Sequence, residues 1–267
     1  MDQIIFLGTG GSRYVMASQR RYTGGILIQH QENQLHIDPG PGALIRCHEF
    51  GIDPTKTTAL LVSHKHIDHS NDINVLIDTI TIGGKHKKGT LICSESLGYK
   101  SSILDVSRLN WLNRLIYLKP NEITRLGDIT IEALPTKHSD ETGIGFKIIT
   151  NKTVLCYTSD TDYTAKIADS YLDADILILN CSLPELMPAK NHLCAGKTAT
   201  ILERVKPKLA ILTHFGNDML DANPLYQARE IQRKTGVQTI AAHDGLTINP
   251  ISYSASSKQK RLNSFKK

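Results

Sequence analysis

No part of this 267-residue sequence contains a run of about 20 consecutive apolar residues, the length that a membrane-spanning helix needs. The first residues, MDQIIFLGTG, carry an acid and run into a strand-like segment. They therefore lack the basic start and the long apolar region of a secretory signal peptide. We expect a protein that has no membrane association and stays in the cytoplasm.

The sequence also lacks cysteines in the spacing of a disulfide framework or a zinc knuckle. None of its cysteines forms a C-x-x-C pair, and their number is odd. The five are scattered along the chain at Cys47, Cys93, Cys156, Cys181 and Cys194. This usage is typical of reduced intracellular proteins, which agrees with a cytoplasmic location.

Low-complexity linkers and internal repeats are missing too, so nothing divides the chain into several domains. With 40% hydrophobic and 21% charged residues it can build one sizeable core. We predict a single domain over residues 1–255, followed by a basic, flexible tail over 256–267, for which an arm that contacts nucleic acid is the alternative. The net charge of +5 is compatible with a phosphate-bearing substrate but does not demonstrate one.

Short segments rich in Ile, Leu, Val and Thr recur along the chain and are bounded by Gly, Pro, Asn or Asp, which predicts strands. The predicted strands cover 4–7, 25–29, 34–37, 59–63, 90–93, 129–133, 145–150, 153–158, 176–180, 209–213 and 239–242. Asn151 and Lys152 separate two of them in IITNKTVLC, as in a hairpin. Helices are predicted after Asn71, over 197–205 and over 224–235. We expect an α/β fold with two sheets between layers of helices.

The segment LLVSHKHIDHS crowds three histidines and an aspartate into six positions, which are His64, His66, Asp68 and His69. Three protonated imidazoles at this spacing would repel one another, and the residues offer little apolar surface for packing. A cation site explains the pattern. His64 and His66 are two residues apart, so on extended backbone they point to the same side and can bind one cation.

Asp68 and His69 follow after the chain turns towards a helix, so they aim elsewhere and favour a second cation. Two cations need further ligands, and apolar strands deliver His138, Asp160 and His214 at their ends. Imidazole with some carboxylate suits zinc first, with manganese or iron as alternatives. The sequence therefore predicts two divalent metal ions that share an activated water.

The H-x-H-x-D-H motif, His138, Asp160 and ILTHFG together resemble the metallo-β-lactamase-fold hydrolases. The resemblance covers nearly the whole chain, from IIFLGTGG through LHIDPGPG to AAHDGL. It implies a four-layer αβ/βα sandwich of two mixed β-sheets flanked by helices, with the site at one edge. The ligands that it implies are His64, His66 and His138 for one metal, Asp68, His69 and His214 for the other, and Asp160 between them.

The opening FLGTGG and the segment NHLCAGKTATILERVKPKLAILTHFG resemble the phosphodiesterase branch of that superfamily. This branch includes ribonuclease Z and a phosphoribosyl cyclic phosphate phosphodiesterase. Ribonuclease Z carries a long tRNA-clamping arm, whereas only 21 residues (160 − 138 − 1) separate His138 from Asp160 here. GSRYVMASQRRYTGG also lacks the cysteines of the extra zinc site in the small phosphodiesterase.

By this resemblance His192 assists the leaving group, and we place His192 and Asp68 in the catalytic machinery. A hydroxide bridging the two metals is expected to attack a phosphodiester in line. Asp38 either orients a ligand histidine or forms a turn before Pro-Gly. His243 either contacts substrate or precedes a plain Asp-Gly turn. The arginines after GTGG could meet a phosphate or remain solvated; they are Arg13, Arg20 and Arg21.

The sequence therefore predicts a phosphodiesterase for a small cyclic or nucleotide-type diester or an RNA end. The alternatives are a lactonase or thioesterase of the same fold, since the same hydroxide attacks an acyl carbon, and a non-catalytic nucleic-acid-binding member. The intact ligand set argues against the last alternative. A homodimer is compatible with the sequence, which specifies neither the substrate nor the native metal.

Overall fold

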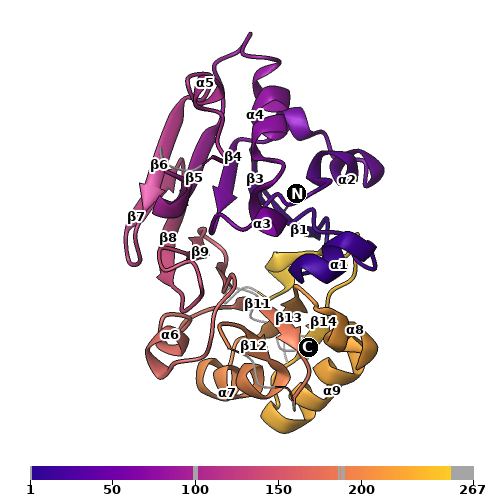
Figure 1. The fold of residues 1–267 in the computed structure, drawn as a ribbon. Helices are drawn as coiled ribbons and strands as arrows, with labels where there is room; N and C mark the ends of the chain where they lie inside the picture. Colours follow the sequence, from indigo (N-terminus) through magenta and orange to yellow (C-terminus); the bar gives the residue numbers. More distant parts are fainter. Residues whose placement is uncertain (1, 99–101, 186, 188–189, 254–267) are drawn as a thin grey trace, which may run out of the picture.

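The protein is described by a computed structural model that covers residues 2–98, 102–185, 187 and 190–253. Two mixed sheets form its centre (Figure 1). In the seven-stranded sheet the strand order is β15-β1-β2-β3-β4-β5-β6. Its strands are β1 (Gln3–Phe6), β2 (Ile26–His30), β3 (Asn33–Ile37), β4 (Ala59–Val62), β5 (Thr90–Ser94), β6 (Arg114–Leu118) and β15 (Thr247–Ile248).

The second sheet has eight strands in the order β14-β13-β11-β10-β9-β8-β7, with β12 paired to β11. Its strands are β7 (Ile123–Leu126), β8 (Ile129–Pro135), β9 (Ile144–Ile149), β10 (Val154–Tyr157), β11 (Ile176–Leu183), β12 (Leu193–Cys194), β13 (Leu209–Thr213) and β14 (Thr239–Ala241). The predicted hairpin is confirmed, because β9 and β10 pair antiparallel and the Thr150 N–H donates to the Thr153 carbonyl at 3.0 Å.

Side chains that face alternate sides of the strands form the core between the two sheets. The inward side chains of β1, such as Ile4 and Phe6, join Ile131 of β8 and Phe146 of β9 in one buried cluster. Successive residues of a strand face opposite sides, so the intervening apolar residues cover the outer faces. Both faces of the central strands are therefore buried, which explains their nearly continuous apolar runs.

Helices cover the two outer faces. In the first half they are α1 (Ser12–Ser18), α2 (Ala43–Glu49), α3 (Ile67–Ser70), α4 (Ile73–Thr81) and α5 (Val106–Leu109). In the second half they are α6 (Ala165–Asp169), α7 (Ala195–Val205), α8 (Asn217–Asp221) and α9 (Pro224–Thr235). Short 3₁₀ turns form η1 (Pro54–Lys56), η2 (Glu95–Leu97) and η3 (Pro250–Tyr253). Helix α4 lies beside the first sheet, and α7 and α9 lie beside the second (Figure 1). Apolar side chains of these helices join buried clusters with the strands that they cover. The predicted α/β arrangement is confirmed.

Helix α9 follows the sequence signals closely. The Asn223 side chain accepts hydrogen bonds from the Leu225 and Tyr226 N–H groups, and Pro224 occupies the first turn. Gly236 ends the helix at φ 72°, a left-handed conformation that glycine adopts without strain. The shorter helices were not predicted: α1, for example, buries only Val15, so it carries no amphipathic pattern.

No helix within the described part of the chain is long and apolar enough to cross a membrane. All five cysteines are free and buried, as the odd, scattered set predicts. The predicted basic tail, 256–267, lies outside the described residues.

Candidate metal centre

One edge of the two sheets collects histidine and aspartate side chains from four separate strand ends. His64 and His66 follow β4, and His138 follows β8. Asp160 follows β10, and His214 follows β13 directly. Helix α3, which begins just after His66, adds Asp68 and His69. All seven predicted ligand residues therefore lie at this edge, in two groups that could each hold a metal ion.

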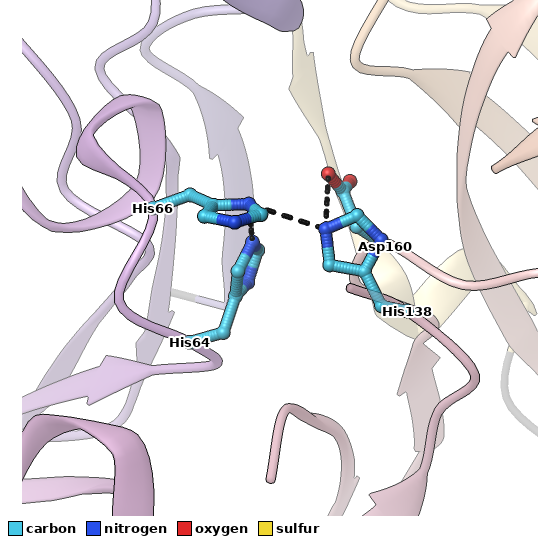
Figure 2. Close-up of side chains that lie close together, drawn as sticks. All are labelled: His64, His66, His138 and Asp160. Carbon is cyan, nitrogen blue, oxygen red and sulfur yellow. Dashed lines mark hydrogen bonds and ion pairs between the residues drawn. The ribbon is translucent and has the colours of Figure 1, made fainter. Parts of the chain in front are cut away.

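The first group consists of His64, His66, His138 and Asp160. Figure 2 shows the two histidines of the H-x-H segment facing His138 and Asp160 across the site. His66 Nδ1 lies 2.9 Å from His64 Nε2 and 3.1 Å from His138 Nε2. Asp160 Oδ2 lies 3.8 Å from His138 Nε2.

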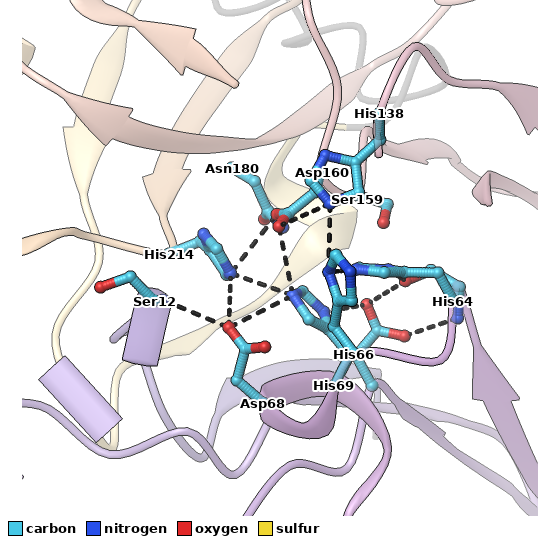
Figure 3. A network of polar contacts seen from close by, with 12 residues as sticks. Ser12, His64, His66, Asp68, His69, His138, Ser159, Asp160, Asn180 and His214 are labelled. Atoms are coloured by element: carbon cyan, nitrogen blue, oxygen red, sulfur yellow. Dashed lines mark hydrogen bonds and ion pairs between the residues drawn. The ribbon is translucent and has the colours of Figure 1, made fainter. Parts of the chain in front are cut away.

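The second group consists of Asp68, His69 and His214. His69 Nε2 lies 3.0 Å from His214 Nε2, and Asp68 Oδ2 lies 3.4 Å from the same atom of His214 (Figure 3). Asp160 also reaches this group, with 3.5 Å to His69 Nε2 and 3.3 Å to His214 Nε2. Its carboxylate thus lies between the two groups.

Several imidazole nitrogens in these groups lie at hydrogen-bond distance from one another. Not every such pair has an N–H to donate. A neutral imidazole has one N–H and one lone pair. His138 Nδ1 donates to the Asn191 carbonyl at 2.9 Å, which leaves the lone pair on Nε2. His69 Nδ1 donates to Asp38 at 2.9 Å, which leaves Nε2 as the atom that faces His214 and Asp160. His66 Nδ1 carries at most one hydrogen, so it cannot donate a full hydrogen bond to both His64 Nε2 and His138 Nε2. Convergent lone pairs of this kind fit a bound cation.

The ionisation of the two aspartates also favours a cation site. Burial alone would raise the pKa of Asp160, but the charges of His214 and His69 outweigh it and hold that pKa well below its usual 3.8. The pKa of Asp68 is lowered against its burial by the same two histidines. Among the described residues, no lysine or arginine forms an ion pair with either carboxylate. Buried carboxylates without such partners call for positive charge from a metal or from protonated histidine.

The pKa values of the histidines shift in opposite directions, depending on their surroundings. Burial, followed by the charge of His69, lowers the pKa of His64 well below 6.5. Burial and the charge of His138 lower the pKa of His66. Burial acts in the same direction on His69, but the charges of Asp160 and Asp68 overcome it and raise that pKa well above 6.5. Neutral imidazole is the form that binds a metal, so His64 and His66 are prepared for this role.

A model of the beta-lactamase superfamily domain matches residues 33–215, which is more than half of the chain. This protein belongs to the beta-lactamase superfamily. The resemblance that the sequence motifs indicate is thereby confirmed, and all seven residues of the two groups lie within the matched range.

Two relatives match this superfamily member over most of their length. An uncharacterised protein of Methanocaldococcus jannaschii is 35% identical over 252 residues, which cover 92% of this chain and 94% of that protein. A ribonuclease Z of Methanosarcina mazei is 22% identical over 278 residues, which cover 83% of this chain and 90% of that protein.

The crystal structure of the metallo-beta-lactamase fold protein YhfI from Bacillus subtilis has the same fold. It superposes with a TM-score of 0.79 at 22% sequence identity, and the match covers 92% of this chain and 98% of that chain. The predicted metallo-β-lactamase fold is therefore confirmed.

Asp38 occupies the position that orients a histidine of the second group. Besides His69, its buried carboxylate accepts hydrogen bonds from the Ser63 N–H and hydroxyl, each at 2.7 Å. The Tyr157 hydroxyl donates to it at 2.7 Å as well. Burial and the Asp38 charge raise the pKa of Tyr157 well above 10, so that this hydroxyl keeps its proton. Asp38 itself has φ 49°, a conformation that aims its side chain at His69.

Three further polar residues support the site, and sequence reasoning did not single them out. The Asn180 amide donates to Asp160 Oδ1 at 2.8 Å and to the Tyr157 hydroxyl at 3.1 Å. The Ser182 hydroxyl lies 3.1 Å from His214 Nδ1. Asn180 and Ser182 interrupt the buried segment ILILNCSL, and that interruption was the available signal. The Ser12 N–H donates to Asp68 Oδ2 at 3.2 Å.

The backbone around the site adopts left-handed conformations at several residues other than glycine. Ser159, Asn191 and His214 have φ of 54°, 64° and 61°. Such conformations cost on the order of 1–3 kcal/mol each and persist where the surrounding structure imposes them. Gly11 is required for a different reason, because a Cβ at this position would overlap the ring of His214.

His192 lies beside the first group, just before β12. Its ring centroid is 4.9 Å from that of His138, and its Nδ1 is 3.7 Å from Asp160 Oδ2. That Nδ1 has no hydrogen-bond partner among the described residues. Burial lowers the pKa of His192, although 35% of its side chain remains exposed. Its Nδ1 is buried, but the exposed part of its side chain lines the cavity over the centre, where a bound molecule can reach it.

A cavity of about 360 Å³ opens over the centre. Its lining includes His66, Asp68, His138, Asp160, His192 and His214 on the inner side and Ser12, Arg13, Tyr14, Ile67 and Ser139 around the mouth. This volume is near the lower end of the range typical for small-molecule sites. The functional groups of all strand ends thus face one space that is open to solvent.

His243 and two of the arginines are not part of this space. His243 is exposed, does not line the cavity, and donates through Nδ1 to the Asp244 carbonyl at 3.1 Å. Asp244 has the structural role, since its carboxylate accepts from the Thr9 N–H and hydroxyl at 2.8 and 2.7 Å. Arg20 pairs with Asp221 at 2.7 Å, and Arg21 does not line the cavity either.

Replacing Asp38 by Asn keeps the side-chain size but removes the charge that fixes the His69 tautomer. We expect the zinc affinity of the Asp38→Asn protein to fall by about 10- to 100-fold, the usual effect of losing a carboxylate behind a metal-binding histidine. Competition with a chromogenic chelator measures this affinity. Asp218→Asn, at an exposed position of α8, is the matched control. Equal affinities of the two folded variants would contradict the orienting role of Asp38.

Proposed function

We propose that this protein is a metal-dependent phosphodiesterase that binds two divalent cations, with zinc the first candidate and manganese or iron the alternatives. His64, His66 and His138 would hold one cation, and Asp68, His69 and His214 the other, with Asp160 between them. The observation that carries this proposal is the convergence of imidazole nitrogens and buried carboxylates in two adjoining groups.

When bound, two such cations make a water ligand more acidic and stabilise negative charge on a phosphoryl group. The chain's own residues would prepare this chemistry. Asp38 and the Asn191 carbonyl hold hydrogens on Nδ1 of His69 and His138, which keeps each Nε2 free to bind. The Ser12 N–H and the Asn180 amide hold the carboxylates of Asp68 and Asp160 in place.

Two observations favour a phosphodiester over an acyl substrate. His192 lies beside the first group and lines the cavity with part of its ring exposed, so it can protonate a leaving alkoxide, which is the poor leaving group of a natural phosphodiester. One relative that covers most of this chain is a ribonuclease Z. The substrate would be a small cyclic or nucleotide-type diester or an RNA end, and the open cavity accommodates either.

A substrate panel tests the proposal directly. We expect zinc-loaded protein to hydrolyse bis-p-nitrophenyl phosphate faster than a lactone or a thioester, and we expect a chelator to abolish the activity. Release of p-nitrophenolate and of thiol are both measured by absorbance. Preference for the lactone or thioester would identify an acyl hydrolase of the same fold. Nucleic-acid binding without hydrolysis of any of these substrates would identify a non-catalytic member.

The role of His192 is tested with two leaving groups. In the His192→Ala protein, turnover of a dinucleoside monophosphate should fall by about 10²- to 10⁴-fold, because its alkoxide needs a proton. Turnover of bis-p-nitrophenyl phosphate should fall much less, because p-nitrophenolate leaves without one. His243→Ala is the matched control for a histidine outside the cavity. Equal losses with both substrates, or loss of bound metal, would contradict a proton donor at this position.

A further inference from the structure

The mouth of the cavity is built differently from its floor. The floor carries the histidines and aspartates, whereas part of the rim consists of Arg13 and Tyr14 from α1 and Ile67 from α3. Tyr14 is 76% exposed and Ile67 is 53% exposed. Single exposed apolar residues are ordinary on protein surfaces, but these two large side chains line the same cavity directly beside a polar centre.

Helix α1 is fixed to the centre, so its side chains have a defined place relative to it. The Ser12 N–H at the start of α1 donates to Asp68 Oδ2, and Asp68 belongs to α3. Tyr14 follows only two residues later on the same short helix. The backbone that carries Tyr14 is therefore anchored to one of the candidate metal-binding residues, and its side chain lines the cavity.

Among the described residues that line the cavity, Arg13 is the one lysine or arginine. Arg20 is bound by Asp221, and Lys137 is 3.5 Å from Asp162. Within the described part of the chain, the Arg13 side chain has neither an ion pair nor a hydrogen bond. An unpaired guanidinium at the rim of a cavity is suited to an anionic group of a bound molecule, and phosphate is the anion that its planar donors match best.

We propose that Tyr14 and Arg13 form a nucleoside-phosphate subsite: a nucleobase stacks on the Tyr14 ring, and Arg13 binds an oxygen of the phosphate being cleaved. This inference rests on the proposed phosphodiesterase function and narrows its substrate to a nucleoside joined through a phosphodiester. Aromatic rings bind all bases by stacking, with little dependence on sequence. The cavity of about 360 Å³ suits one nucleotide unit, which either a small dinucleotide or the end of an RNA provides.

Two diesters with the same leaving group separate the two parts of the subsite. One is the p-nitrophenyl ester of thymidine monophosphate, and the other is methyl p-nitrophenyl phosphate, which has no nucleoside. In Tyr14→Ala we expect KM for the thymidine ester to rise about tenfold and KM for the methyl ester to stay unchanged. Tyr14→Phe, which keeps the ring, should resemble the wild type. Tyr226→Ala is the control, since Tyr226 is 57% exposed on α9 and does not line the cavity.

Arg13→Met should raise KM for both diesters, because both carry the phosphate. Arg125→Met, at an exposed position of β7, is its control. Wild-type kcat/KM then identifies the source of the nucleoside: a higher value with a short oligoribonucleotide than with a dinucleoside monophosphate indicates an RNA end, and the reverse indicates a small nucleotide.

Calorimetry with thymidine monophosphate distinguishes failure of the subsite from failure of the enzymatic proposal. Its affinity should fall about tenfold in Tyr14→Ala, whether or not the protein cleaves either diester. If neither diester is cleaved but this loss occurs, the phosphodiesterase proposal is wrong and the subsite remains. If Tyr14→Ala changes neither the mononucleotide affinity nor the KM ratio of the two diesters, the subsite proposal is overturned.

Discussion

The contact between His66 Nδ1 and the Nε2 atoms of His64 and His138, at 2.9 and 3.1 Å, sets the constraint on which the candidate site depends. Three ring nitrogens cannot all satisfy one another, because too few of them carry hydrogen. The second group is crowded in a similar way, with the Nε2 atoms of His69 and His214 3.0 Å apart. Buried carboxylates next to these rings need positive charge. A pair of bound cations would relieve the crowding of the nitrogens and neutralise the carboxylates together.

The fold brings these groups together by using strand ends from both sheets. Rigid strands fix where each segment leaves the sheet, and the loops then turn the side chains inward. Directing the side chains inward has a conformational cost, since Asp38, Ser159 and His214 all have positive φ. Hydrogen bonds of Asp38 to Ser63, Tyr157 and His69 help to offset that cost and to hold one histidine tautomer. The geometry of the site is thus coupled to the packing of the sheets behind it.

The sequence predicted the strands that deliver the site residues, because long apolar segments with clear boundaries determine them. It also identified the seven residues that the fold collects, since the spacing of His64, His66, Asp68 and His69 has no packing explanation. It could not place His243, which does not line the cavity, because the direction of a loop side chain depends on tertiary contacts. Short helices such as α1 were missed for a similar reason: their place comes from contacts such as the Ser12 hydrogen bond to Asp68.

The central claim is that these side chains hold two cations, and metal content measured by mass spectrometry together with anomalous diffraction from zinc-loaded crystals tests it most directly. The account predicts two zinc ions per chain in the wild type, one bound among His64, His66 and His138 and one among Asp68, His69 and His214. His138→Ala and His214→Ala should each lose the ion of their own group, whereas His243→Ala should keep both. Zinc-loaded crystals without anomalous signal between these side chains would contradict the account.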